Sequence, residues 1–269
     1  MRYGVLGVPI GLLTLVFWAG AAHAGTQPVI TAAEAYVIDA TDGTVPYAKR
    51  EHRRVPVASL TKIMTAYVVR QEARLGDALT ITTADVRHAN ASGATTAGLK
   101  AGERVSVREL LYALLLPSGA DAAHALAERY GPGTSKFVAK MNAAARELGL
   151  NDTRFTNPDG LPGKGYSSAA DQASLAQVAL DDSVLRQVVK AGKHTYRKHV
   201  WRNTNKLLSE GALGLKTGYT TAAGFCLSFA EKRHGHLFIG VVLGETSDAR
   251  RFTTARKLLS YAEGWSSET

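Results

Sequence analysis

A serine and a lysine three residues apart are the first candidates for chemistry in this chain. They form the segment Ser59-Leu60-Thr61-Lys62, at the start of a run with helically spaced apolar residues. Residues three apart share one face of a helix, so the Lys62 amine can reach the Ser59 hydroxyl. A serine becomes a nucleophile when a neighbouring base takes its proton, and a lysine kept neutral by burial can be that base. Taken alone, the pattern more often marks a capping serine and a solvated lysine.

A second candidate is the tripeptide Lys216-Thr217-Gly218, which is followed by Tyr219 and falls in a segment with the pattern of a strand. A cation and a hydroxyl at a strand edge can anchor a carboxylate. A glycine at the same edge lets a substrate backbone approach closely. By itself the tripeptide fits an ordinary strand end with a glycine turn equally well.

A third candidate, Ser118-Gly119-Ala120, lies at the break between two expected helices. A hydroxyl at a rigid corner between helices can relay a proton from a base to a leaving amine. Alone, Ser118 is more simply the N-cap of the following helix.

In this chain order the three candidates resemble the motifs of the penicillin-recognising serine peptidases. Within that superfamily the chain is similar to the low-molecular-mass penicillin-binding proteins of the D-alanyl-D-alanine carboxypeptidase group. The resemblance covers nearly the whole chain after its first 24 residues. Further segments that carry it are 57–66, 155–161, 203–205, 215–220 and 223–226, together with Arg251-Phe252.

The resemblance implies a serine D,D-peptidase that cleaves D-alanyl peptide bonds of peptidoglycan stem peptides through an acyl-enzyme. It is compatible with a carboxypeptidase, a crosslink endopeptidase or both. It implies that Ser59 is the nucleophile, that Lys62 is the base, and that Ser118 passes the proton to the departing amine. β-Lactams would be covalent inhibitors, and neither a metal ion nor an organic cofactor is expected.

The same resemblance assigns the substrate-binding residues. Lys216 and Thr217 would hold the terminal carboxylate with support from Arg251, and Gly218 would let the substrate approach. The backbone N–H groups of the nucleophile and of Tyr219 would form the oxyanion hole. From its type alone, Arg251 could also be a surface charge on the last helix.

One position departs from the family pattern: the third residue of the second motif is usually Asn and here is Ala120. A methyl group cannot hydrogen-bond a substrate amide or a lysine ammonium, so the change puts the rate and the proton path in question. Two alternatives stay open. A β-lactamase would need an acidic deacylation residue, and the segment 151–167 offers only Asp152 and Asp159. The other alternative is a non-catalytic penicillin-binding wall protein, and Ala120 is the only feature of the sequence that supports it.

The elements expected around these residues give an α+β fold, in which both chain ends form one antiparallel sheet and a helical block is inserted between them, as in β-lactamases and D,D-peptidases. We expect the sheet part at about 25–55 and 195–269, and the helical part at about 56–194. The expected strands are a hairpin at 35–50 that turns at Asp42-Gly43, and segments 214–217, 224–230 and 237–243. The expected helices are 59–73, a helix with a capping box at Ser106 and Glu109, 119–130, 135–148, 168–180, 182–190 and one from Asp248; an exposed loop spans 151–167.

Residues 1–24 have the pattern of a cleaved signal peptide. A positive start is followed by an apolar stretch and by Ala22-His23-Ala24, the small-x-small pattern that signal peptidases cut. The alternative is an uncleaved membrane anchor, for which the stretch is short. We therefore expect a catalytic domain at 25–269, secretion to the periplasm and no permanent membrane anchor.

Composition limits the remaining function classes. The net charge of +9 favours attraction to a polyanionic surface such as a cell wall. Nucleic acid is not an expected partner, because the export signal argues against it and the Lys and Arg residues are scattered rather than striped. The single cysteine, Cys226, excludes an intramolecular disulfide and is predicted to be buried and inert. None of the eight histidines has metal-ligand spacing.

Overall fold

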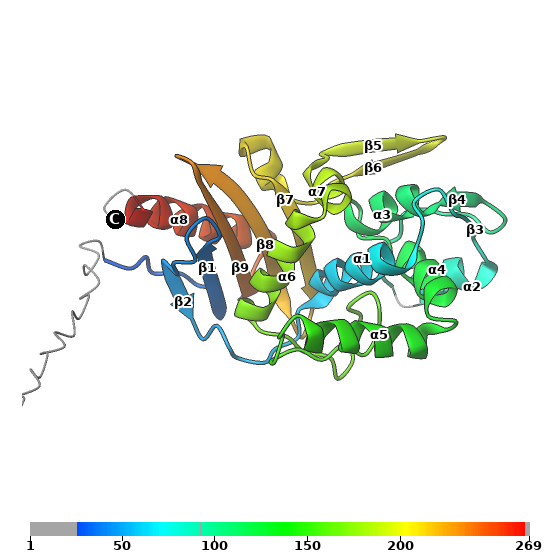
Figure 1. Cartoon of the computed structure of the whole chain (residues 1–269), viewed down its shortest axis with the longest axis horizontal. Helices are drawn as coiled ribbons and strands as arrows, with labels where there is room; N and C mark the ends of the chain where they lie inside the picture. The colour runs from blue at the N-terminus through cyan, green and yellow to red at the C-terminus, as the bar shows by residue number, and fades with distance from the viewer. Residues whose placement is uncertain (1–25, 92, 267–269) are drawn as a thin grey trace, which may run out of the picture.

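The computed structural model describes residues 26–91 and 93–266 (Figure 1). Its main sheet is antiparallel, with the strand order β2-β1-β9-β8-β7. The strands are β1 (Glu34–Asp39), β2 (Tyr47–Lys49), β7 (Gly214–Thr220), β8 (Gly224–Arg233) and β9 (His236–Glu245). Segments from both ends of the chain therefore pair in one sheet, and the predicted α+β class is confirmed.

Helices fill the chain between β2 and β7. They are η1 (Ala58–Leu60), α1 (Thr61–Glu72), α2 (Thr83–Ala91), α3 (Val107–Leu115), α4 (Ala120–Tyr130), α5 (Thr134–Glu147), α6 (Ala169–Asp181), α7 (Ser183–Lys190) and η2 (Lys206–Glu210). Two small two-stranded sheets accompany them: β3 (Ala78–Thr80) pairs with β4 (Arg104–Ser106) across α2, and β5 (Lys193–Tyr196) forms a hairpin with β6 (His199–Arg202). The last helix, α8 (Asp248–Ser266), follows β9.

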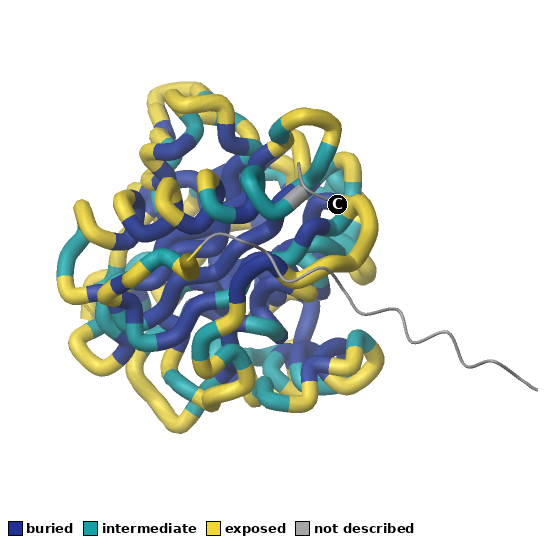
Figure 2. Tube along the Cα trace, turned by 90° about the vertical axis from the view of Figure 1, so that its left-hand side faces the viewer, coloured by how far each residue is buried: buried dark blue, intermediate teal, exposed yellow. Residues whose placement is uncertain are grey.

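Alternation along β9 gives the main sheet two apolar faces. Phe238 and Val242 belong to the cluster that packs against α8, whereas Ile239, Val241 and Leu243 belong to the cluster shared with the helical block. Successive side chains of a strand point to opposite faces, so both faces must be covered. In Figure 1, α8 covers one face and α6 crosses the other. Figure 2 shows the buried residues gathered in the interior, with the exposed ones on the outer loops.

The predicted hairpin and last helix are confirmed. Asp42 Oδ1 accepts a hydrogen bond from Thr44 N at 2.9 Å, and Gly43 has a φ of +82°, the left-handed region that suits glycine. The apolar stripe of α8 is buried against the sheet, and its members are Phe252, Ala255, Leu258, Leu259 and Ala262.

The capping box is confirmed only in part. Ser106 Oγ accepts from Glu109 N at 3.4 Å, as predicted. The Glu109 carboxylate forms a hydrogen bond with His194 Nε2 at 2.6 Å. His194 lies on the β5–β6 hairpin, which the sequence did not predict, because short polar strands lack a clear apolar period. Helix α2 was also missed, because it is short and its sequence has no clear apolar stripe.

The prediction that 151–167 is an exposed loop is wrong in its central part, where Phe155 and Asp159 are buried. Asn157 closes a turn there: its Oδ1 accepts from Gly160 N at 2.7 Å and its Nδ2 donates to Leu161 O at 2.9 Å. Thr65 on α1 donates to Pro158 O at 2.5 Å. The loop is therefore folded back onto the helix that follows the candidate nucleophile. A polar composition did not reveal this, because its polar groups bond within the loop and to α1.

The predicted leader, residues 1–24, lies outside the described residues. Within 26–91 and 93–266, the structure contains no helix that is both long and apolar enough to cross a membrane.

Gly240 provides a test of how tightly the sheet packs. It stands opposite Phe229 on β8, and a Cβ at Gly240 would lie 2.2 Å from Phe229 Cζ. Phe229 is fully buried, so Gly240→Ala should lower the free energy of unfolding by about 1–3 kcal/mol in urea titrations. The control Gly76→Ala places its Cβ in open space and should change stability by less than about 0.5 kcal/mol. Equal stability of the two variants would contradict this packing.

Candidate active site

Ser59 lies in the turn η1, directly before α1. Two glycines let backbone from other parts of the chain reach this turn. A Cβ on Gly218 of β7 would lie 3.1 Å from Ser59 N and 3.0 Å from Val57 O. A Cβ on Gly160 would lie 1.9 Å from Ala58 O, closer than any side chain could approach. The glycine of the Lys-Thr-Gly motif therefore makes room for the turn that holds Ser59, the predicted nucleophile.

Lys62 points at the Ser59 hydroxyl from the first turn of α1. Its Nζ donates to Ser59 Oγ at 3.1 Å and to Asp159 O at 2.6 Å, and the residue is 2% exposed. Burial lowers the pKa of Lys62 to about 8, although the charges of Asp159 and Asp121 act in the opposite direction. Such an amine is neutral in about one molecule in ten at pH 7, which is enough for a general base.

The first turn of α4 holds the loop on the other side of the cleft. Asp121 is fully buried and accepts from Ala97 N at 2.9 Å and from Leu99 N at 3.1 Å. Ala120 N donates to Thr95 O at 2.8 Å. The Ala120 side chain is buried and is not among the residues that line the cleft. The position usually occupied by Asn thus contributes its backbone to this loop.

Ser118 lies between α3 and α4 and lines the same cleft as Ser59 and Lys62. Its φ of +69° is uncommon for a residue with a side chain. Such backbone strain persists only where the surroundings enforce it, and it concentrates at functional sites. The structure therefore brings all three predicted catalytic side chains to one cleft.

Lys216 on β7 is almost completely buried, at 1% exposed, and its Nζ donates to Thr217 O at 3.0 Å. Burial holds its pKa well below the usual range, and the nearby charges of Lys62 and Arg251 add to this effect. Lys216 is not among the residues that line the cleft, so its charge lies behind the wall. Thr217 does line the cleft, and its Oγ1 shares a hydrogen bond with Thr204 Oγ1 at 2.6 Å.

Thr204 is a site residue to which the sequence analysis gave no role. Its segment, 203–205, was noted only as part of the resemblance. Its backbone N donates to Leu116 O at 3.3 Å, which ties the segment to the end of α3. A threonine in a loop has no spacing relative to the three motifs, so only the folded chain places it beside Thr217.

Arg251 is not a surface charge. The residue is buried on α8, and its Nη1 donates to Gly218 O at 2.9 Å and to Cys226 O at 3.2 Å. Its Nη2 forms an ion pair with Asp248, and burial lowers its pKa despite that partner. Arg251 therefore joins β7 and β8 at the end of the third motif, and it also lines the cleft.

The cleft has a volume of about 470 Å³. The basic side chains of Lys62, Lys216 and Arg251 lie in or directly behind its walls, which favours a substrate with a negatively charged end. Tyr219, 54% exposed, stands at the cleft with its ring 4.3 Å from that of Phe225. The other residues of the lining are Ser59, Gly93, Ala94, Thr95, Pro117, Ser118, Gly160, Leu161, Pro162, Thr204, Thr217, Gly218, Thr220 and Thr221.

Cys226 is buried and reduced on β8, as predicted. Burial raises the pKa of its thiol to about 12, so the reactive thiolate is scarce at neutral pH.

Within the described part of the chain, Asp39, Asp42 and His236 are the one group whose donor atoms are close enough to share a metal ion. Asp39 and Asp42 lie at the β1–β2 turn and His236 at the start of β9, and His236 Nδ1 already bonds Asp39 Oδ2 at 2.5 Å. They do not line the cleft, so we assign them no part in its chemistry.

Comparison with known proteins gives one consistent family. Residues 21–247 match the model described as D-alanyl-D-alanine carboxypeptidase. The chain is 40% identical over 261 residues to the D-alanyl-D-alanine carboxypeptidase of Streptomyces sp. strain K15, covering 89% of this chain and 90% of the relative. It is 33% identical to a D-alanyl-D-alanine endopeptidase of Haemophilus influenzae, covering 86% and 82%. The crystal structure of the Streptomyces K15 DD-transpeptidase superposes with a TM-score of 0.86 at 40% identity, covering 90% of this chain and all of that one.

The pKa of Lys62 predicts how the reactivity of Ser59 depends on pH. Only the neutral amine accepts a proton, and its fraction rises with pH, so the rate constant for acylation of Ser59 by benzylpenicillin should rise to a plateau with a midpoint near the pKa of about 8. Stopped-flow or quenched mass spectrometry between pH 6 and about pH 10 would measure it. The variant Lys62→Arg keeps the positive charge, but its guanidinium cannot accept a proton in this pH range. Its acylation should be too slow to show the rise of the rate constant with pH. A rate that does not change with pH in the wild type would contradict the assignment.

Proposed function

The chain belongs to the D-alanyl-D-alanine carboxypeptidase family of serine peptidases, and we propose that it cleaves D-alanyl bonds of peptidoglycan stem peptides with Ser59 as nucleophile and Lys62 as base. One observation carries the assignment of these roles. Lys62 Nζ lies 3.1 Å from Ser59 Oγ in a buried site where its pKa is lowered to about 8. A serine and a lysine that met only as a cap and a solvated charge would have neither feature.

In the proposed acylation, Ser59 Oγ attacks the carbonyl carbon of the penultimate D-alanine while Lys62 Nζ takes the hydroxyl proton. The C–N bond of the tetrahedral intermediate then breaks, and the terminal D-alanine leaves as an amine. The proton reaches that amine from the Lys62 ammonium through the Ser118 hydroxyl, which lines the same cleft. Water then attacks the ester carbonyl carbon while Lys62 takes its proton. The C–O bond to Ser59 breaks, the proton passes from Lys62 back to Ser59 Oγ, and the shortened peptide leaves with a free carboxylate.

The negative charge of the tetrahedral intermediate would be stabilised by the backbone N–H groups of Ser59 and Tyr219. The short distance between Ser59 N and the Cβ position of Gly218, 3.1 Å, supports this because it brings the nucleophile turn next to β7. In measured enzymes, losing one such donor costs about 2.7–4 kcal/mol of transition-state stabilisation.

The substrate carboxylate would bind at Thr217, with Arg251 at the adjoining wall of the cleft. Lys216 would act from behind the wall: burial lowers its pKa, and the charge of a bound carboxylate would favour the ammonium form, which attracts that carboxylate through a medium that screens charge poorly. The hydrogen bond between Thr217 and Thr204 would hold the receiving hydroxyl in place.

The two other functions considered from the sequence have less support. A β-lactamase needs a carboxylate that activates water at the acyl-enzyme. Asp152 pairs with Arg54 at 2.9 Å, the carboxylate of Asp159 is bonded to His88 at 2.6 Å, and neither residue lines the cleft. A non-catalytic wall protein would not need a buried lysine with a lowered pKa against a serine hydroxyl.

We further propose that the protein acts outside the cytoplasm, in the periplasm. The pattern of residues 1–24 supports export, and peptidoglycan, the substrate of this family, is built outside the cytoplasmic membrane. The net charge of +9 favours attraction to the anionic wall.

Intact-mass analysis after incubation with benzylpenicillin tests the proposal. We expect a one-to-one adduct in the wild type and none in Ser59→Ala, because the drug acylates the same hydroxyl as the substrate. The wild type should also release D-alanine from a stem pentapeptide or split a crosslinked dimer, and the ratio of the two activities would show which substrate it prefers. Ser118→Ala should still bind the drug but form the adduct more slowly, by about 100-fold, because it loses the proton relay.

Rapid release of hydrolysed drug without a lasting adduct would favour a β-lactamase. An absence of adduct, drug hydrolysis and peptide cleavage in the folded wild type would contradict the enzymatic function.

A further inference from the structure

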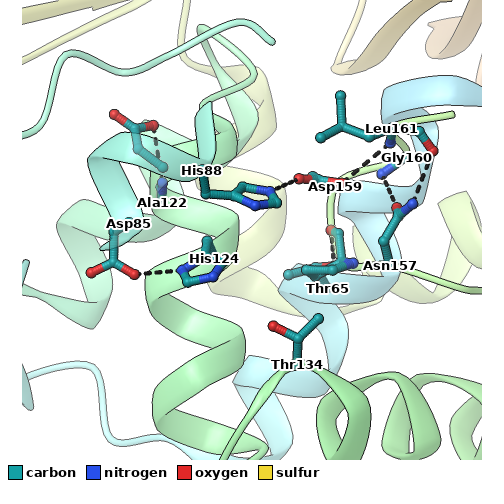
Figure 3. Close-up of polar contacts among 12 residues, drawn as sticks. Thr65, Asp85, His88, Ala122, His124, Thr134, Asn157, Asp159, Gly160 and Leu161 are labelled. Carbon is teal, nitrogen blue, oxygen red and sulfur yellow. Dashed lines mark hydrogen bonds and ion pairs between the residues drawn. The ribbon is translucent and has the colours of Figure 1, made fainter. Parts of the chain in front are cut away.

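Two histidine–carboxylate pairs lie at and beside Asp159, whose carbonyl accepts from Lys62, and Figure 3 shows both pairs. His88 Nε2 forms a hydrogen bond with Asp159 Oδ2 at 2.6 Å, and His124 Nδ1 forms one with Asp85 Oδ1 at 2.6 Å. The two imidazole rings are stacked, with centroids 4.6 Å apart and planes inclined by 29°. Asp85 and His88 come from α2, His124 comes from α4, and Asp159 comes from the loop before α6. The function proposed above uses none of these side chains.

Asp159 connects this cluster to the general base through a single residue. Its backbone carbonyl accepts from Lys62 Nζ at 2.6 Å, while its carboxylate accepts from Leu161 N at 3.2 Å and bonds His88. The residue is completely buried. Burial alone would raise the pKa of this carboxyl, but the hydrogen bond with His88 and the charge of Lys62 hold it below its usual range. The carboxylate therefore stays ionised and depends on its partners for stabilisation.

We propose that His88 is a positioning residue for the general base: by holding the Asp159 carboxylate, it fixes the carbonyl that orients the Lys62 amine toward Ser59. This inference rests on the proposed function of the Ser59–Lys62 pair. His124 supports the arrangement by stacking on the His88 ring, and its own bond to Asp85 fixes the ring plane.

Three hydrogen bonds hold the turn around Asp159. Thr65 donates to Pro158 O in the peptide before Asp159, and Asn157 accepts from Gly160 N, which belongs to the same planar peptide as the Asp159 carbonyl. The bond of the carboxylate to His88 is the third, and it holds the Asp159 side chain, and with it the position of the turn, against the wall opposite Lys62. A lysine with four rotatable bonds has no direction of its own, so a displaced carbonyl would let Nζ move away from Ser59 Oγ. A displacement of about 1 Å at a reacting group can lower a rate about 100-fold.

Replacement of His88 should therefore slow the chemical step and leave binding unchanged. With benzylpenicillin, the acylation rate constant at saturation should fall about tenfold or more in His88→Ala. The dissociation constant of the initial complex should stay within about twofold, because His88 does not line the cleft. His88→Gln keeps an N–H near the position of Nε2 and should recover most of the rate.

Asp159→Asn provides the coupling test, since it keeps the carbonyl and removes the charge. If His88 acts through Asp159, the effects of His88→Ala and Asp159→Asn on the acylation rate constant will not multiply in the double variant. Multiplicative effects would overturn the proposal.

His194→Ala is the matched control. His194 is also bonded to a carboxylate, Glu109, at 2.6 Å, and its side chain is 25% exposed against 27% for His88. It stacks on Tyr112 and belongs to the β5–β6 hairpin. The variant His194→Ala should lower the thermal unfolding temperature about as much as His88→Ala does, but its acylation rate should equal that of the wild type. If folded His88→Ala is acylated at the wild-type rate, only the inference about His88 is overturned. If the wild-type protein forms no adduct at Ser59, the proposed function itself is overturned.

Discussion

The burial of one ammonium group is the constraint on which the rest of the site depends. Lys62 Nζ is shielded from water and reaches Ser59 Oγ and Asp159 O. Removing a cation from water costs free energy, and that cost is what lowers its pKa to about 8 and suits it to the proposed role of base. The buried carboxylates of Asp159 and Asp121 limit the cost without cancelling it. If a carboxylate were hydrogen-bonded directly to Nζ, its negative charge would keep the lysine protonated. A carbonyl oxygen orients it and leaves it able to lose its proton.

Backbone contacts that only glycine permits bring the parts of this site together. Gly218 lets β7 lie against the nucleophile turn, and Gly160 lets the loop after Asp159 lie against Ala58 O. Arg251 secures the same strand end from the opposite face of the sheet, through the carbonyls of Gly218 and Cys226. The sheet, the helical block and α8 therefore each supply one wall of the cleft. This arrangement holds the basic side chains of Lys62, Lys216 and Arg251 in or directly behind the walls of one cleft.

The absence of an amide at Ala120 does not leave the cleft without polar contacts. The carbonyl of Asp159 orients Lys62, and the hydroxyls of Thr204 and Thr217 are bonded to each other at the wall. The backbone of Ala120 holds the loop at Thr95, which also faces the cleft. Positioning of the base from behind, through Asp159, suits a family member in which the second motif offers no side-chain amide.

The sequence alone predicted the fold class from local spacing: two residues on one helical turn, a strand period, a capping serine and a tight turn at Asp42-Gly43. The order of its motifs, through the resemblance to a known family, predicted Ser59, Lys62, Lys216 and Thr217 as a group. The sequence analysis missed α2, the β5–β6 hairpin, Thr204, and the burial of Asp159, and it left Arg251 between a site residue and a surface charge. Each of these is decided by contacts between residues far apart in the chain, such as Lys62 with Asp159 or Arg251 with Gly218. Spacing within a segment cannot encode them, because a buried polar group is recognisable only from the partners that folding brings to it.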